Sequence, residues 1–384
     1  MYILVLGNGI PSADYPKQGA FAFDQACLLR RAGLEVVYGS LDFRSLRRKR
    51  TWGFHREEKK GLPCFEISLP LGPLPQGLLE KIGGRAFARL LEKVSQAQGG
   101  PPLLVHAHFL KLGEAAAPTC RAQSIPLYLT EHSSILHETP LDPTIKRRAM
   151  ALYPGLMRLV TVSESLRRNI LKETGFDSTV IHNVIDTSLF SFEGGEGEKE
   201  GPFQFVSAGN LLPIKNYDIL LRAFAIHLES HPESRLTLFG DGPEREGLER
   251  LVRDLHIESN VAMEGMVERS TIARAYKKAH AFVLLSRKET FGLAYVEALA
   301  SGLPVIASRC GGPDEFMKED YGELVEVGDI FGAARAMDRV HEDYDRYDRP
   351  QIAREVKAGF SGEAIASRLV ALYRGDFPKL SKRA

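Results

Sequence analysis

Residues 281–307 hold a short apolar run, a polar turn, a helical segment and a second short apolar run, in that order. The runs at 281–285 and 304–307 have the length and composition of buried strands, and the helical segment between them ends near Gly302. Two strands joined by a helix run parallel, because the crossover returns the chain to the edge of the sheet where the first strand began. This stretch therefore predicts an α/β protein built on parallel sheet, with helices on both faces.

The same alternation occurs along the whole chain, in two halves. The first half has apolar runs at 2–6, 35–38, 103–108, 126–132, 159–162 and 180–184, with helices predicted at 20–32 and after Ser163, which reads as an N-cap. The second half has such runs at 203–207, 235–239 and 260–263 before the stretch above, and Asn216 is expected to cap a helix there. Between the halves, residues 192–201 are acidic and rich in glycine, which is typical of a linker.

The length of 384 residues suffices for two domains. We expect a Rossmann-like domain at 1–190, a linker at 191–202, a second Rossmann-like domain at 203–360, and a C-terminal helix at 361–384 that packs towards the first domain. The two domains would face each other across a cleft that closes on substrate by hinge motion near 190–202.

Composition excludes several classes of protein. The net charge of +1 gives no nucleic-acid signature, and no apolar run approaches the roughly 20 residues that span a bilayer. The four cysteines are widely spaced and form no CxxC pair, which argues against a zinc knuckle and favours a reducing compartment. The N-terminal residues lack the charged region of a signal peptide. We therefore expect a cytoplasmic protein.

Charge is unevenly distributed between the halves. Residues 1–190 carry 24 Lys and Arg against 17 Asp and Glu, a net +7, and the remainder is net −6. Residues 44–60 are strongly basic and include Trp52 and Phe54, so we predict a long connection there. Two interpretations stay open: a solvated loop, or a peripheral contact with an anionic membrane on the cytoplasmic face.

The stretch 286–297, which covers the turn and the start of the helix, also carries candidate chemistry. Glu289 lies in the turn and Glu297 lies in the helix, eight residues later. Between them, the backbone N–H groups of residues 291–293 stand near a helix N-terminus, which favours phosphate. Carboxylates beside a phosphate site can accept hydrogen bonds from sugar hydroxyls. Together these features suggest a nucleotide sugar.

Two predicted strands of the first half end in histidine, at His108 and His132. Ligands of open α/β sheets bind beyond the C-terminal ends of strands. Histidine in that place can be a general base, a phosphate donor or a satisfied structural residue. The position favours a functional role for His132 more than for His108.

A nicotinamide-dependent oxidoreductase is the alternative from a different class. Gly7-x-Gly9 resembles the start of a dinucleotide fingerprint, but Ser12 stands where its third glycine belongs, and a long loop replaces the tight turn. Asp42 is placed only loosely for a ribose contact.

At this point the chain resembles the retaining glycosyltransferases of family 4, which have the two-domain GT-B fold. The resemblance runs from the first predicted strand to the last helix. Its motifs are Glu289-x7-Glu297 within residues 286–307, Gly311-Gly-Pro-Asp-Glu315, Gly240-Asp-Gly-Pro243 and Ile181-His-Asn-Val-Ile-Asp186.

The resemblance implies roles for named residues. In the second domain, Glu297 would hold the ribose hydroxyls, Glu289 the transferred sugar, and Val267 the base. The donor-binding N–H groups would come from Phe291, Gly292 and Leu293, beside Thr290, and Lys215 would neutralise charge on the leaving group. In the first domain, Gly19 would approach the diphosphate and His132 would reach the sugar. His132, Glu289 and Lys215 are thus the candidate catalytic residues.

The resemblance also implies retention of anomeric configuration, a nucleotide-sugar co-substrate, and no cofactor or metal. The donor would be a UDP-sugar, with GDP-mannose next, and the acceptor a glycan or a lipid-linked saccharide. The family usually has arginine where this chain has Asn210. Lys215 alone could suffice, or Arg287, Lys288 or Arg309 could substitute. In a third reading the chain is a non-catalytic nucleotide-sugar-binding protein.

Overall fold

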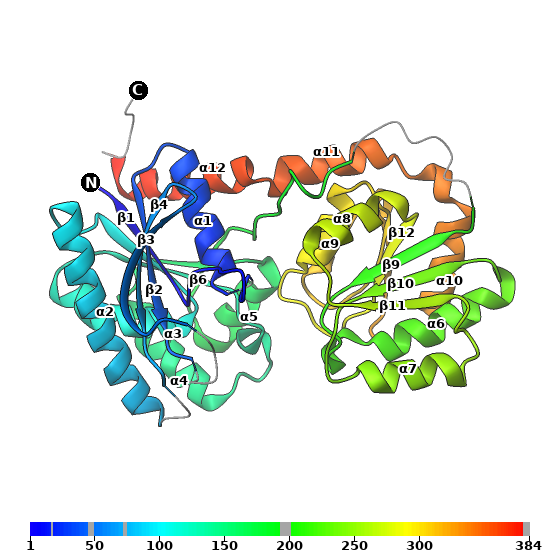
Figure 1. Cartoon of the computed structure of the whole chain (residues 1–384), viewed down its shortest axis with the longest axis horizontal. Coiled ribbons are helices and arrows are strands. Elements are labelled where there is room, and N and C mark those ends of the chain that lie inside the picture. The colour runs from blue at the N-terminus through cyan, green and yellow to red at the C-terminus, as the bar shows by residue number, and fades with distance from the viewer. Residues whose placement is uncertain (17, 45–49, 72–74, 193–200, 379–384) are drawn as a thin grey trace. The chain divides into compact units, whose positions relative to one another are not determined.

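The computed structural model describes residues 1–16, 18–44, 50–71, 75–192 and 201–378 (Figure 1). The chain forms two compact units, Met1–Val184 with Glu363–Ala384, and Ile185–Gly362. Residues 193–200 of the predicted linker lie outside the described residues. Among the described helices, none combines the length and the apolar composition that crossing a bilayer requires.

The first unit is built on an eight-stranded sheet with the order β3-β4-β2-β1-β5-β6-β7-β8. The strands are β1 Ile3–Gly7, β2 Val36–Asp42, β3 Gly53–Lys59, β4 Leu62–Ser68, β5 Leu104–His108, β6 Leu127–Glu131, β7 Arg158–Thr161 and β8 Thr179–Val180. All neighbours pair in parallel except β3 and β4, which are antiparallel. Of the run at 180–184, predicted as a full strand, only Val180 lies in a strand, because β8 consists of Thr179 and Val180.

The basic segment 44–60 was predicted as a long connection, and that prediction is wrong for its second half. Residues 53–59 form β3, an edge strand that pairs with β4. Lys60 and Gly61 join the two strands with φ values of 50° and 70°. Positive φ at both turn residues is the geometry of the two-residue hairpin turn whose twist matches the strands. Residues 45–49 lie outside the described residues.

Helices α1 Ala20–Arg31, α2 Gln76–Gln98, α3 Leu110–Ala122, α4 Pro143–Leu152 and α5 Glu164–Thr174 accompany the first sheet. Ser163 caps α5 as predicted, because its Oγ accepts a hydrogen bond from the Leu166 N–H at 3.1 Å. The C-terminal helix α12, Gly362–Asp376, also packs into this unit. Its buried Leu369 and Tyr373 belong to the same core as Ile3 and Val5 of β1.

The second unit has a six-stranded parallel sheet with the order β11-β10-β9-β12-β13-β14. The strands are β9 Gln204–Ala208, β10 Arg235–Phe239, β11 Val261–Gly265, β12 Ala281–Leu284, β13 Val305–Ser308 and β14 Gly322–Val325. The helices are α6 Tyr217–Ser230, α7 Arg245–Asp254, α8 Arg269–Lys278, α9 Leu293–Ala300, α10 Ile330–Glu342 and α11 Arg349–Phe360. In Figure 1, α6 and α7 lie on one side of the strands, and α8 and α9 lie on the other. Every residue of β12 and β13 is buried, as expected of strands covered on both faces.

Candidate active site

The strand order of the second unit defines where a ligand can bind. From β9 the chain moves outward through β10 and β11, and then returns to place β12 on the other side of β9. The loops that follow β9 and β12 therefore leave the sheet in opposite directions. Parallel sheets bind ligands in the crevice that opens at such a switch point, at the carboxyl ends of the strands. Lys215 follows β9 and Glu289 follows β12, so the sequence-predicted residues are on the two loops that border this point.

The loop after β9 is fixed by close backbone packing. A Cβ atom on Gly240 would lie 1.8 Å from the Gly209 carbonyl oxygen, so only glycine fits there. The Leu211 N–H donates to the Asp241 carbonyl oxygen at 3.0 Å. Asn210, between the two contacts, is exposed.

Asn216 does not cap α6 through its side chain, contrary to the prediction. Its backbone is left-handed, with φ 56°, and its side chain makes no cap hydrogen bond. Instead, the Arg287 Nε donates to Asn216 Oδ1 at 2.5 Å, and the Arg287 N–H donates to the Ile214 carbonyl oxygen at 2.8 Å. These two bonds tie the loop after β9 to the loop after β12. Asn216 is 1% exposed, so its amide is better placed to hold the two loops together than to start a helix.

Lys215 and Glu289 are joined across the switch point. The Lys215 Nζ donates to Glu289 Oε1 at 2.5 Å, and the Ser286 Oγ donates to the same oxygen at 2.8 Å. The Lys215 side chain is 21% exposed and that of Glu289 is 11% exposed. Oε2 of Glu289 takes no hydrogen bond from the described residues. This oxygen is available to a ligand hydroxyl.

The N-terminus of α9 begins directly after this pair. Gly292 has φ 94°, and a Cβ atom on it would lie 2.7 Å from Cδ2 of the buried Tyr295. Gly312 approaches Phe291 just as closely, with 2.3 Å between a built Cβ and the Phe291 carbonyl oxygen. Two glycines thus let the backbone enter the helix in a tight turn. The first N–H groups of a helix lack partners within it and carry partial positive charge, so this turn suits an anion. Thr290 and Leu293, half-buried, flank it.

Glu297 lies on α9 and is 8% exposed. Burial raises the pKa of its carboxyl to about 7, although the nearby Arg269 guanidinium opposes the rise. Arg269 donates from Nη2 to Glu297 Oε1 and stands over the Phe190 ring, 5.2 Å from its centroid. Sequence reasoning missed Arg269. The available signal was its place at the first turn of α8, two residues after the predicted base contact Val267, which is half-buried.

In the first unit, His132 belongs to a chain of hydrogen bonds. Its Nδ1 lies 3.0 Å from Asn183 Oδ1, and its Nε2 lies 2.8 Å from His108 Nδ1. Because a carbonyl oxygen only accepts, Nδ1 of His132 carries the proton, and Nε2 accepts from His108 Nδ1–H. Nε2 of His108 is then a buried lone pair with no partner among the described residues. Burial lowers the pKa of His132 to about 4, so the ring is neutral at pH 7.

His132 also stacks on Phe21, with ring centroids 5.2 Å apart. The two rings line a small pocket of the first unit together with Thr130 and Asn183. Gly19 opens α1 with φ 62°, and a Cβ there would lie 2.0 Å from the Gly9 carbonyl oxygen. Glycine is therefore required at 19 by the packing of the loop itself, whatever else approaches it.

Models of known protein families match both halves of the chain. The model for "Glycosyltransferase Family 4" matches residues 19–189, and that for "Glycosyl transferases group 1" matches residues 191–355. The N-acetyl-alpha-D-glucosaminyl L-malate synthase of Bacillus anthracis is 31% identical over 262 residues, which are 65% of this chain and 68% of that protein. The chain belongs to glycosyltransferase family 4.

Solved structures show that this family 4 enzyme has the predicted GT-B fold. The sucrose-phosphate synthase from Thermosynechococcus elongatus superposes with a TM-score of 0.80 at 22% identity, covering 99% of this chain and all of that one. HepE of Anabaena, in complex with UDP-glucose, gives a TM-score of 0.73 at 19% identity over 98% of this chain. The chain is therefore a glycosyltransferase of GT-B architecture.

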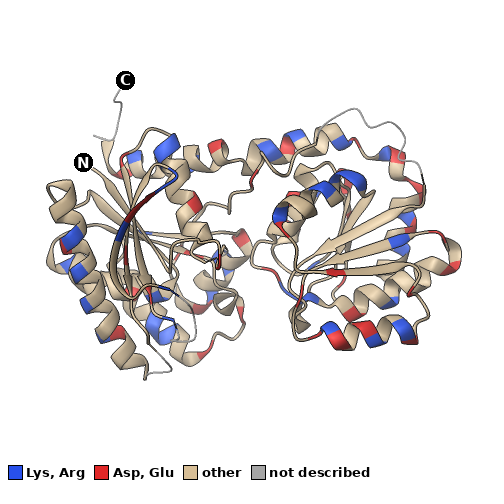
Figure 2. Ribbon diagram, in the orientation of Figure 1, with Lys and Arg blue, Asp and Glu red and all other residues tan. Residues whose placement is uncertain are grey.

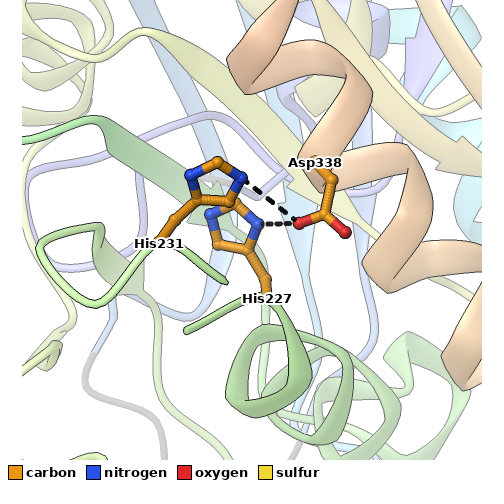
Figure 3. Close-up of side chains that lie close together, drawn as sticks. All are labelled: His227, His231 and Asp338. Atoms are coloured by element: carbon orange, nitrogen blue, oxygen red, sulfur yellow. Dashed lines mark hydrogen bonds and ion pairs between the residues drawn. The ribbon is translucent and has the colours of Figure 1, made fainter. Parts of the chain in front are cut away.

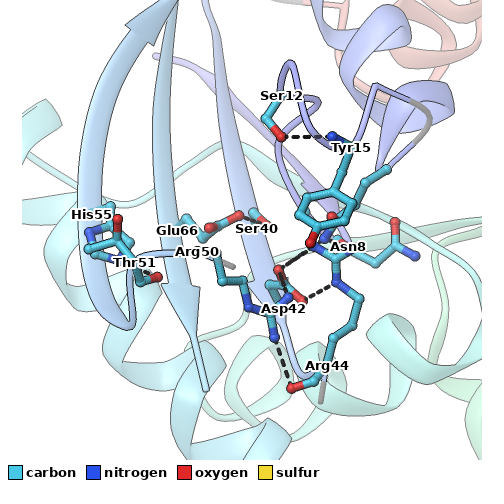
Figure 4. Close-up of polar contacts among 12 residues, drawn as sticks. Asn8, Ser12, Tyr15, Ser40, Asp42, Arg44, Arg50, Thr51, His55 and Glu66 are labelled. Atoms are coloured by element: carbon cyan, nitrogen blue, oxygen red, sulfur yellow. Dashed lines mark hydrogen bonds and ion pairs between the residues drawn. The ribbon is translucent and has the colours of Figure 1, made fainter. Parts of the chain in front are cut away.

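The oxidoreductase alternative is wrong for this glycosyltransferase, and Asp42 has another role. Figure 4 shows its carboxylate surrounded by cationic and amide donors. The Arg44 Nε donates to Oδ1 at 2.8 Å, Gln18 Nε2 donates to Oδ2 at 2.9 Å, and Arg50 also donates to Oδ2. Asp42 is 2% exposed, so these contacts leave no face for a ribose.

Proposed function

We propose that this glycosyltransferase moves a hexosyl group from a UDP-sugar to a glycan or lipid-linked acceptor, with retention of anomeric configuration. The observation that carries the proposal is the joining of Lys215, Ser286 and Glu289 at the switch point, directly before the N-terminus of α9. This places a cation, helix N–H groups and a partly unsatisfied carboxylate around one point. A sugar diphosphate needs donors for phosphate and acceptors for hydroxyls within a few ångströms of each other.

The diphosphate is the first part of the donor to assign. Its oxygens would accept from the N–H groups of Phe291, Gly292 and Leu293. Lys215 would turn from Glu289 towards the leaving phosphate and stabilise the charge that develops as the glycosidic bond breaks. The released oxygens of Glu289 would then accept from hydroxyls of the transferred sugar.

Asn210 is the departure from the family pattern, because it donates hydrogen bonds without charge. Two of the three cations that could substitute are engaged elsewhere: Arg287 bonds Asn216, and the Arg309 Nε lies 3.4 Å from Glu326 Oε1. Lys288 forms no ion pair within the described part of the chain. We propose that Lys288 supplies the second charge if Lys215 does not act alone.

Glu297 is proposed to hold both ribose hydroxyls, with Arg269 fixing the orientation of its carboxylate through Oε1. Val267, on the loop that precedes α8, would contact the base. Uracil is our first choice of base, because the structural relative HepE is solved with UDP-glucose. GDP-mannose is second.

His132 is proposed to contact the sugar from the first unit. Both of its ring nitrogens already have partners, Asn183 and His108, so a sugar hydroxyl would replace one of them. No protein nucleophile is assigned. Retention would follow from attack on the same face as departure, assisted by the leaving phosphate.

Contact with an anionic membrane gains little support from the charges of the first unit. Lys and Arg are interspersed with Asp and Glu rather than gathered in one field (Figure 2). Arg148 bonds Glu114 at 2.6 Å, and Arg167 bonds Asp177 at 2.7 Å. Of the basic cluster at 47–50, Arg50 pairs with Asp42, and residues 47–49 lie outside the described residues. Sedimentation with anionic liposomes at low salt tests the point, and we expect weak binding.

The test is a thermal-shift screen over UDP-, GDP-, ADP- and dTDP-sugars, followed by a turnover assay for released nucleotide. We expect a UDP-sugar to raise Tm and to be consumed, and NAD(H) to have no effect. Glu289→Ala and His132→Ala should abolish transfer without changing the circular dichroism spectrum. Near-normal transfer by both variants would show that the site assignment is wrong.

A non-catalytic nucleotide-sugar-binding protein is the second candidate, and the uncharged Asn210 is the observation that favours it. Such a protein would give the thermal shift without turnover. Asn210→Arg would then be expected to create activity, whereas in the enzyme it should change an existing rate.

A further inference from the structure

Three imidazoles and two carboxylates gather between α6 and α10 of the second unit. Figure 3 shows His227, His231 and Asp338 of this cluster. His227 lies in the last turn of α6, and His231 is the residue that follows that helix. Asp338 and His341 lie on the facing turn of α10, which ends at Glu342. None of these residues was singled out by the sequence motifs or used in the proposed transfer.

The potential ligand atoms converge. Nδ1 of His227 lies 2.6 Å from Asp338 Oδ1, and Nε2 of His231 lies 3.8 Å from the same oxygen. The three atoms all lie within 4.8 Å of one another. Ligands about 2.0–2.2 Å from a tetrahedral zinc ion stand roughly 3.3–3.5 Å apart, so small side-chain movements would complete the geometry. Glu342 Oε1, 3.7 Å from His231 Nε2, is placed to be a fourth ligand.

Two ring nitrogens of the cluster lack hydrogen-bond partners. Nε2 of His231 and Nδ1 of His341 are buried, and neither has a hydrogen-bond partner among the described residues. The rings of His231 and His341 are packed with centroids 4.2 Å apart. A buried polar atom without a partner destabilises the folded state, and a bound cation would give His231 Nε2 a partner.

The surroundings of His227 fit a metal ligand. His227 is fully buried, and its second nitrogen, Nε2, lies 3.0 Å from Ser234 Oγ. Ligating histidines use the nitrogen away from the metal in this way, since that hydrogen bond fixes the tautomer and the ring orientation.

We propose that His227 Nδ1, His231 Nε2 and Asp338 Oδ1 bind a divalent transition-metal ion, with Zn²⁺ as the best match and Glu342 as the fourth ligand. Two imidazoles with carboxylate oxygens in a small cluster suit Zn²⁺, whereas Mg²⁺ and Ca²⁺ prefer six or more oxygen ligands. The competing account is a metal-free ion pair between His227 and Asp338.

The site is structural and separate from the transfer chemistry. Lys215 lies just before α6, and His227 and His231 lie at its other end. The helix has 14 residues, which span about 21 Å at 1.5 Å per residue. The ion would clamp α6 to α10, and its binding can be measured whether or not the proposed donor assignment holds.

The test is titration of protein without a polyhistidine tag, stripped with chelator and followed by calorimetry with Zn²⁺ and by visible absorption with Co²⁺. We expect saturable binding of one ion per chain, a tetrahedral Co²⁺ spectrum, and a Tm raised by Zn²⁺. His231→Gln and Asp338→Asn should each weaken binding by at least about tenfold. His55→Gln, which removes a half-buried imidazole of the first unit, should leave Zn²⁺ binding unchanged.

Circular dichroism spectra that match wild type establish that the variants are folded. Both side chains are partly exposed, 18% for His231 and 29% for Asp338, so neither substitution replaces a fully buried side chain. Absence of saturable binding by wild type would overturn the proposal. Equal Zn²⁺ affinity of the His231→Gln and His55→Gln variants would also overturn it.

Discussion

The buried carboxyl of Glu297 makes donor affinity depend on pH in a defined way. Its pKa is raised to about 7 because it is desolvated on α9. A ribose diol needs the ionised form, which can accept two hydrogen bonds, whereas the protonated form keeps one oxygen as a donor. As the pH falls through 7, the fraction of molecules with ionised Glu297 falls from nearly all at pH 8 to about one part in eleven at pH 6. The apparent Kd should therefore rise roughly tenfold between pH 8 and pH 6.

The measurement is calorimetric titration with UDP-glucose, or with whichever donor the thermal-shift screen prefers, at half-unit steps from pH 6 to 8. A nucleotide sugar is preferable to UDP, whose terminal phosphate itself titrates near pH 6. The matched control is Glu297→Gln, which cannot ionise. It should bind about 10–100 times more weakly at pH 8, since a hydrogen bond to a charged group contributes about 1.5–3 kcal/mol. Its affinity should show little dependence on pH. The reasoning is refuted if wild type is flat over this range, or if the variant keeps the tenfold dependence.

Three further predictions concern the scaffold. Burial raises the pKa of Glu131 to about 8, so its charged form is destabilised in the folded state. The free energy of unfolding of wild type should therefore fall by about 3 kcal/mol between pH 5 and 8. Glu131→Gln should remove that dependence, measured by the fluorescence of Trp52, the sole tryptophan. Leu369→Ala on α12 should destabilise the first unit by about 2–5 kcal/mol in urea unfolding. The control Leu171→Ala, at a partly exposed position, should cost less than about 1 kcal/mol. Equal effects of the two substitutions would mean that α12 is not part of that core. Gly292→Ala should lower the free energy of unfolding by about 1–2 kcal/mol and weaken donor binding, because φ is 94° and the added Cβ would meet Tyr295. Gly247→Ala in α7 is the control, because its Cβ would enter open space and should not destabilise the fold. The test is the Tm of each variant.

The fold could be predicted from sequence because the central strands of both sheets, such as β1, β5, β12 and β13, are fully buried. In β12 and β13 every residue is apolar or small, and such runs between helical segments have few other solutions. The edge strand β3 was missed for the opposite reason. Its pattern, with Arg56, Glu57 and Glu58 exposed, reads as a charged loop, and only pairing with β4 makes it a strand.

The residue types along the sequence located the candidate site, but the hydrogen-bond partners of the site residues depend on tertiary structure. Glu289 and Lys215 were predicted as separate contacts, and sequence separation of 74 residues hides the bond between them. Asn216 was predicted to cap a helix, but its side-chain oxygen accepts a hydrogen bond from Arg287, which is distant in sequence. Likewise, nothing in the sequence near Glu297 indicates that Arg269 bonds it or that burial raises its pKa.

The central claim is that Lys215 acts on the leaving diphosphate beside Glu289. The most direct measurement is kcat for nucleotide release with Lys215→Ala, with Lys278→Ala, an exposed lysine on α8, as the control. Loss of a preorganised charge at the leaving group predicts a decrease of about 10²–10³ in kcat for Lys215→Ala, and no more than a small change for the control. A kcat for Lys215→Ala within a few fold of wild type, at saturating donor, would contradict the account.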